Sequence, residues 1–208
     1  MVTTAVARSG SPRLATRLLQ LTILWNVIEG FVAVRAGVVA GSVALVGFGL
    51  DSFIEVTAAA VLLWRMRLPD DDDRVEARER VAHWVVGATF IALAGYIIVQ
   101  TAYILATGQE PESSPVGLVL ALASLTVMPA IGLVKRSNAM RLGSSALVAE
   151  STETLICSYL SFALLLGLAA NALFGWGWAD IAAALAMVPW IAKEGVEGLR
   201  GGACDDGD

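Results

Sequence analysis

The stretch Gly41-Ser-Val-Ala-Leu-Val-Gly-Phe-Gly-Leu-Asp51-Ser-Phe-Ile-Glu55 combines the two properties that decide the fold. It belongs to an apolar run from 42 to 64, and a helix needs roughly 20 apolar residues to cross a bilayer. The same run carries two acids, Asp51 and Glu55, near its middle. Acids in a membrane span almost always face other helices rather than lipid. This stretch therefore predicts one membrane helix in a bundle.

The composition of the whole chain agrees with a membrane protein. Of the 208 residues, 57% are hydrophobic and 16% charged, with a mean hydropathy of +0.71. Soluble domains are about 45–50% apolar and about 25% charged. The net charge of −5 argues against a basic surface for nucleic acid. Cys157 and Cys204 lie in an apolar run and in the C-terminal tail, so they predict no disulfide framework.

Six apolar stretches run along the chain, and each predicts a transmembrane helix. They cover 18–36, 42–64, 81–106, 116–134, 142–173 and 179–191. Their continuity favours helices over the alternating strands of a barrel. The predicted fold class is an all-α, six-helix transmembrane bundle. We expect an N-terminal segment at 1–14, a transport domain at 15–200 and a tail at 201–208.

The basic residues predict how this bundle is oriented. All 14 of them except Arg35 fall on one side of the predicted spans. By the positive-inside rule, both chain ends are expected in the cytoplasm. The protein is thus expected in the cytoplasmic membrane as a multi-pass protein. Its composition, rich in Arg and Ala, is typical of a GC-rich bacterial genome.

Five acids lie inside the apolar stretches, and they are the main functional signal of the sequence. They are Glu29, Asp51, Glu55, Glu150 and Glu153. A charged residue at the bilayer centre costs at least about 2.5–3.5 kcal/mol. No basic residue lies near the middle of these stretches to act as a partner. We therefore expect protons, a bound cation or both to supply the countercharge.

The spacing of four of these acids predicts a cation site. Asp51 and Glu55 are four residues apart, and Glu150 and Glu153 three apart, so each pair shares one helix face. Two such helices would enclose a cation with four carboxylates, although structural packing between helices is an alternative. Secondary candidates for the metal site are Glu29, Asn26 and Thr154. Glu29 is also consistent with a proton relay or a hydrogen bond to Asn26.

Other polar and aromatic segments predict simpler roles. The acidic run 70–73 is expected to be a solvated turn, with a loading site for cations as the alternative. His83 is expected at the membrane interface, and the aromatic segment 174–178 in an interface belt. Asp180 is expected to be the N-cap of the sixth helix.

One short segment occurs twice in the chain. Gly41-Ser-Val-Ala-Leu-Val46 recurs as Gly143-Ser-Ser-Ala-Leu-Val148, and the same offset carries Asp51 onto Glu153. The two predicted helices run in opposite directions across the membrane. Inverted repeats often build a midplane site in transporters. Coincidence in a chain so rich in Ala, Val and Gly is the other explanation.

Three segments together resemble the cation diffusion facilitator family. The stretch 41–55 is similar to the family's second helix, in which an Asp stands four residues after another acid or a His and follows a Gly-Ser start. The segment Ala146-Leu-Val-Ala-Glu150-Ser-Thr-Glu153-Thr154 resembles its fifth helix. Trp176-Gly-Trp-Ala-Asp180 resembles the start of its sixth helix. The resemblance covers about residues 15 to 200.

This resemblance implies a tetrahedral metal site made by the second and fifth helices. Asp51, Glu55 and Glu150 match ligand positions, whereas the fourth position falls on Thr154, so Glu153 is the expected substitute. The family exports Zn²⁺ or related divalent ions against protons. Carboxylate ligands suit harder ions such as Mn²⁺ and Fe²⁺, with Zn²⁺, Co²⁺ and Cd²⁺ as the other candidates. The family's C-terminal cytoplasmic domain is not expected here, so we expect a homodimer held by membrane helices.

The sequence thus predicts a divalent metal/proton antiporter that works by alternating access. Its expected partners are the lipid bilayer, metal ions and protons, with no nucleic acid, no resident cofactor and no enzymatic activity. A proton-coupled exporter of organic cations is the first alternative, since it would use the same acids. A non-transporting membrane accessory protein is the second, and it would function without them.

Overall fold

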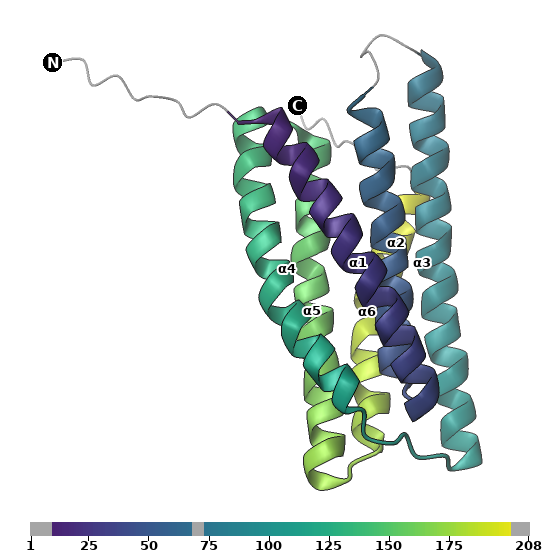
Figure 1. The fold of residues 1–208 in the computed structure, drawn as a ribbon. Helices are drawn as coiled ribbons and strands as arrows, with labels where there is room; N and C mark the ends of the chain where they lie inside the picture. Colours follow the sequence, from purple (N-terminus) through teal and green to yellow (C-terminus); the bar gives the residue numbers. More distant parts are fainter. Residues whose placement is uncertain (1–9, 68–72, 201–208) are drawn as a thin grey trace, which may run out of the picture.

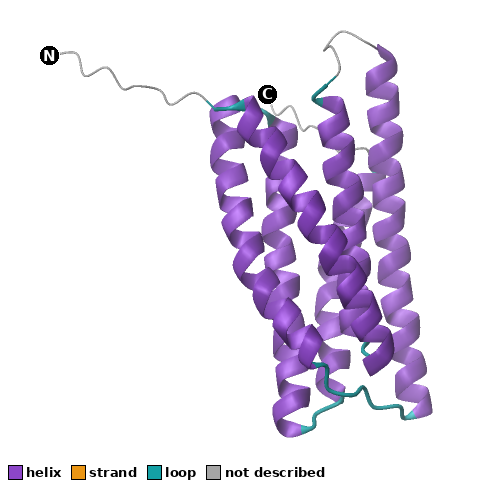
Figure 2. Cartoon of the chain, in the orientation of Figure 1, coloured by secondary structure: helices purple, strands orange, loops and turns teal. Residues whose placement is uncertain are grey.

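The computed structural model describes residues 10–67 and 73–200, and it folds as an all-α bundle in this part of the chain (Figures 1 and 2). The predicted fold class is therefore confirmed. The helices in chain order are α1 (Pro12–Ala40), α2 (Val43–Arg65), α3 (Asp73–Thr107), α4 (Pro115–Leu142), α5 (Ser145–Phe174) and α6 (Trp178–Leu199).

The repeated Gly-Ser segment forms the same turn at two places. Gly41 and Gly143 end α1 and α4 in the left-handed conformation, with φ of 66° and 67°, which glycine adopts at little cost. Ser42 and Ser144 follow as N-caps, and each hydroxyl accepts a hydrogen bond from the backbone N–H three residues later. The two turns thus start α2 and α5, which run in opposite directions (Figure 1).

Five helices, α1 to α5, contain stretches that are long and apolar enough to cross a membrane. α6 has 22 residues but carries three charged residues near its end, which are Lys193, Glu194 and Glu197. It continues past the apolar stretch that ends at 191, up to Leu199. α6 therefore joins an apolar half to a charged C-terminal part.

Two of the predicted helix boundaries differ from the structure, and the difference decides where Lys135 lies. α4 extends to Leu142 instead of ending at 134, and α5 begins at Ser145 instead of 142. The reason is local, because Gly143 and Ser144 set the end of one helix and the start of the next. Lys135 consequently lies inside α4, where its side chain is buried.

The bundle is built from helix pairs. α1 packs most extensively against α2, α4 against α5, and α3 against α6. Gly37 and Gly49 let the backbones of α1 and α2 approach closely, because a Cβ atom at either would lie 2.7–2.8 Å from a backbone nitrogen of the other helix. α1 begins and α6 ends at the same end of the bundle, which we call the terminal end; the opposite end is the distal end (Figure 1).

Asp180 corrects one prediction from the sequence. It does not cap α6, whose N-cap position is Gly177 and has no side-chain hydrogen bond. Its buried carboxylate instead accepts hydrogen bonds from the Ser42 hydroxyl and from the backbone N–H groups of Val43 and Ala44. Asp180 therefore caps α2, because the folded bundle brings the start of α6 beside the start of α2.

Three aromatic side chains gather at the distal end. Phe174, Trp176 and Trp178 are exposed, and their rings stack in series with centroids 5.0 and 5.5 Å apart. Their exposure suits the interface belt expected from the sequence. Residues 70–72 of the acidic run and the side chains of Asp73 and His83 lie outside the described part of the structure.

Candidate metal centre

A small acidic cavity lies among α2, α5 and α6. Its lining includes Asp51 and Glu55 of α2, Glu153 and Cys157 of α5, and Glu194 of α6. Apolar and aromatic side chains complete the wall: Phe90, Ile156, Leu160, Trp190 and Ile191. The volume is about 20 Å³, slightly more than one water molecule requires. The cavity therefore has the size of a single ion or water.

Three side chains already approach metal-ligand spacing in this cavity. One ligand atom each of Asp51, Glu55 and Cys157 lies within 4.8 Å of the other two. These side chains are 4%, 7% and 1% exposed. Bonds of about 2.0–2.3 Å to one Zn²⁺ would bring such atoms somewhat closer together. Small side-chain movements therefore separate this arrangement from a closed coordination shell.

The acids of the cavity lack positive partners among the described residues. Asp51 and Glu153 form no hydrogen bond or ion pair there, whereas Glu55 accepts a hydrogen bond from the side-chain amide of Asn26 at 2.5 Å. Burying a carboxylate without a partner is costly. The cavity is thus short of positive charge, as the sequence led us to expect for Asp51, Glu55 and Glu153.

Glu150 lies in different surroundings from those expected. Its Oε1 is 2.5 Å from Nζ of Lys135, and the same ammonium donates a hydrogen bond to Thr154 at 3.0 Å. All three side chains are buried, and neither Glu150 nor Thr154 lines the acidic cavity. The expectation that these acids have no basic partner is therefore wrong for Glu150, because the longer α4 brings Lys135 against α5.

Glu29 also lies away from the cavity lining. It is fully buried, and its Oε2 accepts a hydrogen bond from the hydroxyl of Ser52 at 3.2 Å. Asn26, which was one expected partner, donates to Glu55 instead. Glu29 therefore links α1 to α2, and Asn26 links α1 to the acidic cavity.

Two lining residues, Cys157 and Glu194, were not among the candidates predicted from the sequence. The internal repeat contained the signal for Cys157, because the offset that carries Asp51 onto Glu153 also carries Glu55 onto Cys157. Each copy thus places two lining residues four apart on one helix face. Glu194 has no such signal, because only the packing of α6 against α2 and α5 brings it to the cavity.

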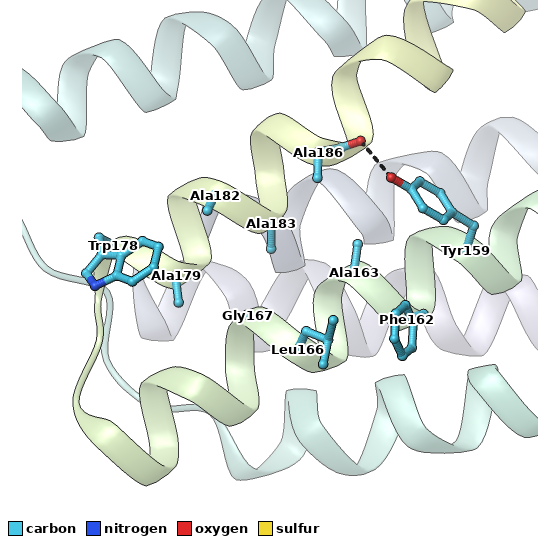
Figure 3. Close-up of a pocket in the computed structure, with 10 residues that line it drawn as sticks. All are labelled: Tyr159, Phe162, Ala163, Leu166, Gly167, Trp178, Ala179, Ala182, Ala183 and Ala186. Carbon is cyan, nitrogen blue, oxygen red and sulfur yellow. Dashed lines mark hydrogen bonds between the residues drawn. The ribbon is translucent and has the colours of Figure 1, made fainter.

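A larger cavity of about 350 Å³ lies between α5 and α6 but has no acidic lining (Figure 3). Alanine, glycine and large apolar side chains surround it, and the hydroxyl of Tyr159 donates to the carbonyl of Ala186 at 3.4 Å. Phe162, Leu166 and Trp178 at this groove are exposed on the outside of the bundle. Its apolar lining suits lipid contact and contains no carboxylate to hold a cation.

A bundle of membrane helices around a small acidic cavity defines a class of protein, the multi-pass membrane proteins with an internal polar site. Comparison with known families specifies it further. The chain belongs to the cation efflux family, since the model of the cation efflux transmembrane domain matches residues 19–202. This confirms the family predicted from the sequence. The protein is therefore a multi-pass membrane transporter of metal cations, and the family consists of transporters rather than enzymes.

Proposed function

We propose that the protein exchanges a divalent transition-metal ion for protons, and that Asp51, Glu55, Glu153 and Cys157 bind the metal. The observation that carries this proposal is the cavity itself, in which Asp51, Glu55 and Cys157 converge within 4.8 Å and Asp51 has no partner among the described residues. Cys157 takes the place of Glu150 in the ligand set expected from the sequence, because Glu150 is paired with Lys135.

The chemistry of these ligands supports Zn²⁺ as the first candidate ion. A thiolate is a soft ligand that favours Zn²⁺ or Cd²⁺, whereas carboxylates alone favour harder ions such as Mn²⁺. Two ligands from α2 and two from α5 make a set of four, the number that Zn²⁺ prefers. Cys157 therefore shifts our expectation from Mn²⁺ and Fe²⁺ towards Zn²⁺, Co²⁺ and Cd²⁺.

The same ligands provide a reason for exchange with protons. A metal ion binds deprotonated carboxylates and thiolates, so metal and protons compete for one set of atoms. Metal that enters from the cytoplasm would displace protons, and protons from the other side would later displace the metal. Alternating exposure of the cavity to the two sides would convert this competition into antiport.

The volume of the cavity favours a metal ion over an organic cation. Sites for drug-sized ligands occupy about 300–1,000 Å³, whereas the acidic cavity has about 20 Å³. The larger groove between α5 and α6 contains no acid to attract a cation. A bare ion therefore suits the acids better than a hydrophobic cation does.

Transport by purified protein in liposomes tests this proposal. With a pH gradient and a trapped zinc-sensitive dye, we expect wild-type protein to move Zn²⁺ and Asp51→Asn to retain less than roughly a tenth of the rate, because a ligand is lost. Glu197→Gln is the control, since Glu197 is half-exposed and paired with Lys193. Wild-type rates for Asp51→Asn would refute the site. Movement of ethidium without Zn²⁺ would support the organic-cation alternative.

A further inference from the structure

Glu194 is the one acid of the cavity that the proposed ligand set does not use. It lies on α6, whereas the four proposed ligands lie on α2 and α5. Glu194 lines the cavity together with Asp51 and Glu153. The third helix of the cavity thus contributes a carboxylate of its own.

Glu194 is more accessible than the two acids of α2. It is half-buried, whereas Asp51 and Glu55 are 4% and 7% exposed. It lies five residues before Leu199, so about 7.5 Å from the end of α6 at 1.5 Å per residue. A cation that enters the cavity beside α6 would therefore meet Glu194 before the buried acids of α2.

The charged residues that neighbour Glu194 on α6 pair with each other and not with Glu194. Lys193 forms an ion pair with Glu197 at 3.5 Å and lies over the ring of Trp190 at 4.6 Å from its centroid. Both members of that pair are about half-exposed, at 52% and 55%. No ion pair to Glu194 occurs among the side chains that the structure describes. An approaching cation would therefore have no ion pair to break at Glu194.

The cavity also contains buried groups that could bind a cation after it has reached Glu194. Asp51, which is 4% exposed, and the thiol of Cys157, which is 1% exposed, both line the cavity. Asp51 has no hydrogen-bond partner among the described residues. A cation that reaches the half-buried Glu194 thus has a more deeply buried, unsatisfied carboxylate in the same cavity.

We propose that Glu194 captures the divalent cation at the mouth of the cavity and passes it to Asp51, Glu55, Glu153 and Cys157. This inference rests on the proposed function and adds a residue that determines the rate of loading. A charge at the rim of a site acts mainly on the association rate and its salt dependence, whereas a ligand in the site acts mainly on dissociation. The two roles are therefore separable by kinetics.

Stopped-flow measurements of Zn²⁺ binding to the full-length protein in detergent test this role. A chromophoric zinc chelator reports the free ion. We expect Glu194→Gln to lower the association rate constant roughly three- to tenfold and to weaken its salt dependence. The dissociation rate and the amount of Zn²⁺ bound at saturation should remain near wild type. Glu194→Asp, which keeps the charge, should recover most of the association rate.

Two control variants distinguish a failure of the capture role from a failure of the proposed metal site. Glu197→Gln lies one helical turn away and should bind at the wild-type rate, because Glu197 does not line the cavity. Asp51→Asn should lose saturable binding, and if it does not, the proposed function fails rather than the role of Glu194. An unchanged association rate in Glu194→Gln would overturn the capture role. Faster dissociation alone would also overturn it and make Glu194 a ligand.

Discussion

At the scale of single residues, we expect the buried ion pair of Lys135 and Glu150 to have a large effect on stability. Both side chains are more than nine-tenths buried, and their charged atoms are 2.5 Å apart. Thr154 accepts a further hydrogen bond from the same ammonium. Removing one member of a buried pair leaves an uncompensated charge, whereas removing both charges together costs far less.

A double-mutant cycle measures this pair. We expect Lys135→Met to lower the free energy of unfolding by about 3–5 kcal/mol, because Glu150 remains buried without its partner. Adding Glu150→Gln to this variant should restore most of the loss. Unfolding in mixed detergent micelles, followed by tryptophan fluorescence, provides the measurement. Additive effects of the two changes would show that the side chains do not interact.

The same double variant also tests the sequence-based assignment of Glu150 as a metal ligand. If Glu150 only holds α5 against α4, Lys135→Met with Glu150→Gln should bind Zn²⁺ with wild-type stoichiometry. Loss of binding in a folded double variant would return Glu150 to the ligand set. Asp51 and Glu55 do not depend on this result, because they line the cavity directly.

At the scale of the helices, close backbone approach holds α1 against α2. A Cβ atom at Gly49 would lie 2.8 Å from the backbone nitrogen of Val34, so one helix must shift to accept it. We expect Gly49→Ala to lower the free energy of unfolding by roughly 1–3 kcal/mol. Gly95 of α3 is the matched control, since a Cβ there meets no atom within 4 Å.

Gly95→Ala should be neutral or should stabilise the protein by up to about 1 kcal/mol, because alanine favours helices more than glycine does. Thermal unfolding of both variants, followed by circular dichroism, compares them under one condition. If both changes destabilise equally, the effect belongs to glycine in these helices generally and not to the contact between α1 and α2.

At the scale of the whole molecule, the charge distribution predicts the sidedness of transport. All 14 basic residues except Arg35 lie on the side of the terminal end in the predicted topology, so we expect this end in the cytoplasm. A fluorescent protein fused after Asp208 should therefore fluoresce. Alkaline phosphatase inserted after Glu110, in the loop before α4, should be active outside. The reverse pattern would mean that the cavity loads from the other side.

Much of the fold was predictable because its signals are local. Long apolar runs specify membrane helices wherever they occur. The acids Asp51 and Glu55 were identifiable for the same reason, since their spacing on one helix needs no knowledge of the other helices. Glu153 followed from its place in the repeat and from its position one residue before Thr154.

The remaining assignments depended on contacts between helices that are distant in the sequence. Lys135 pairs with Glu150 across α4 and α5, and Asp180 of α6 caps α2, so neither partner was evident from local spacing. Helix packing also brings Cys157 and Glu194 to one cavity. The sequence by itself determined the membrane helices and the positions of the acids within them, because these follow from neighbouring residues. Only the tertiary structure decided which charges meet, because the distances between helices arise from packing.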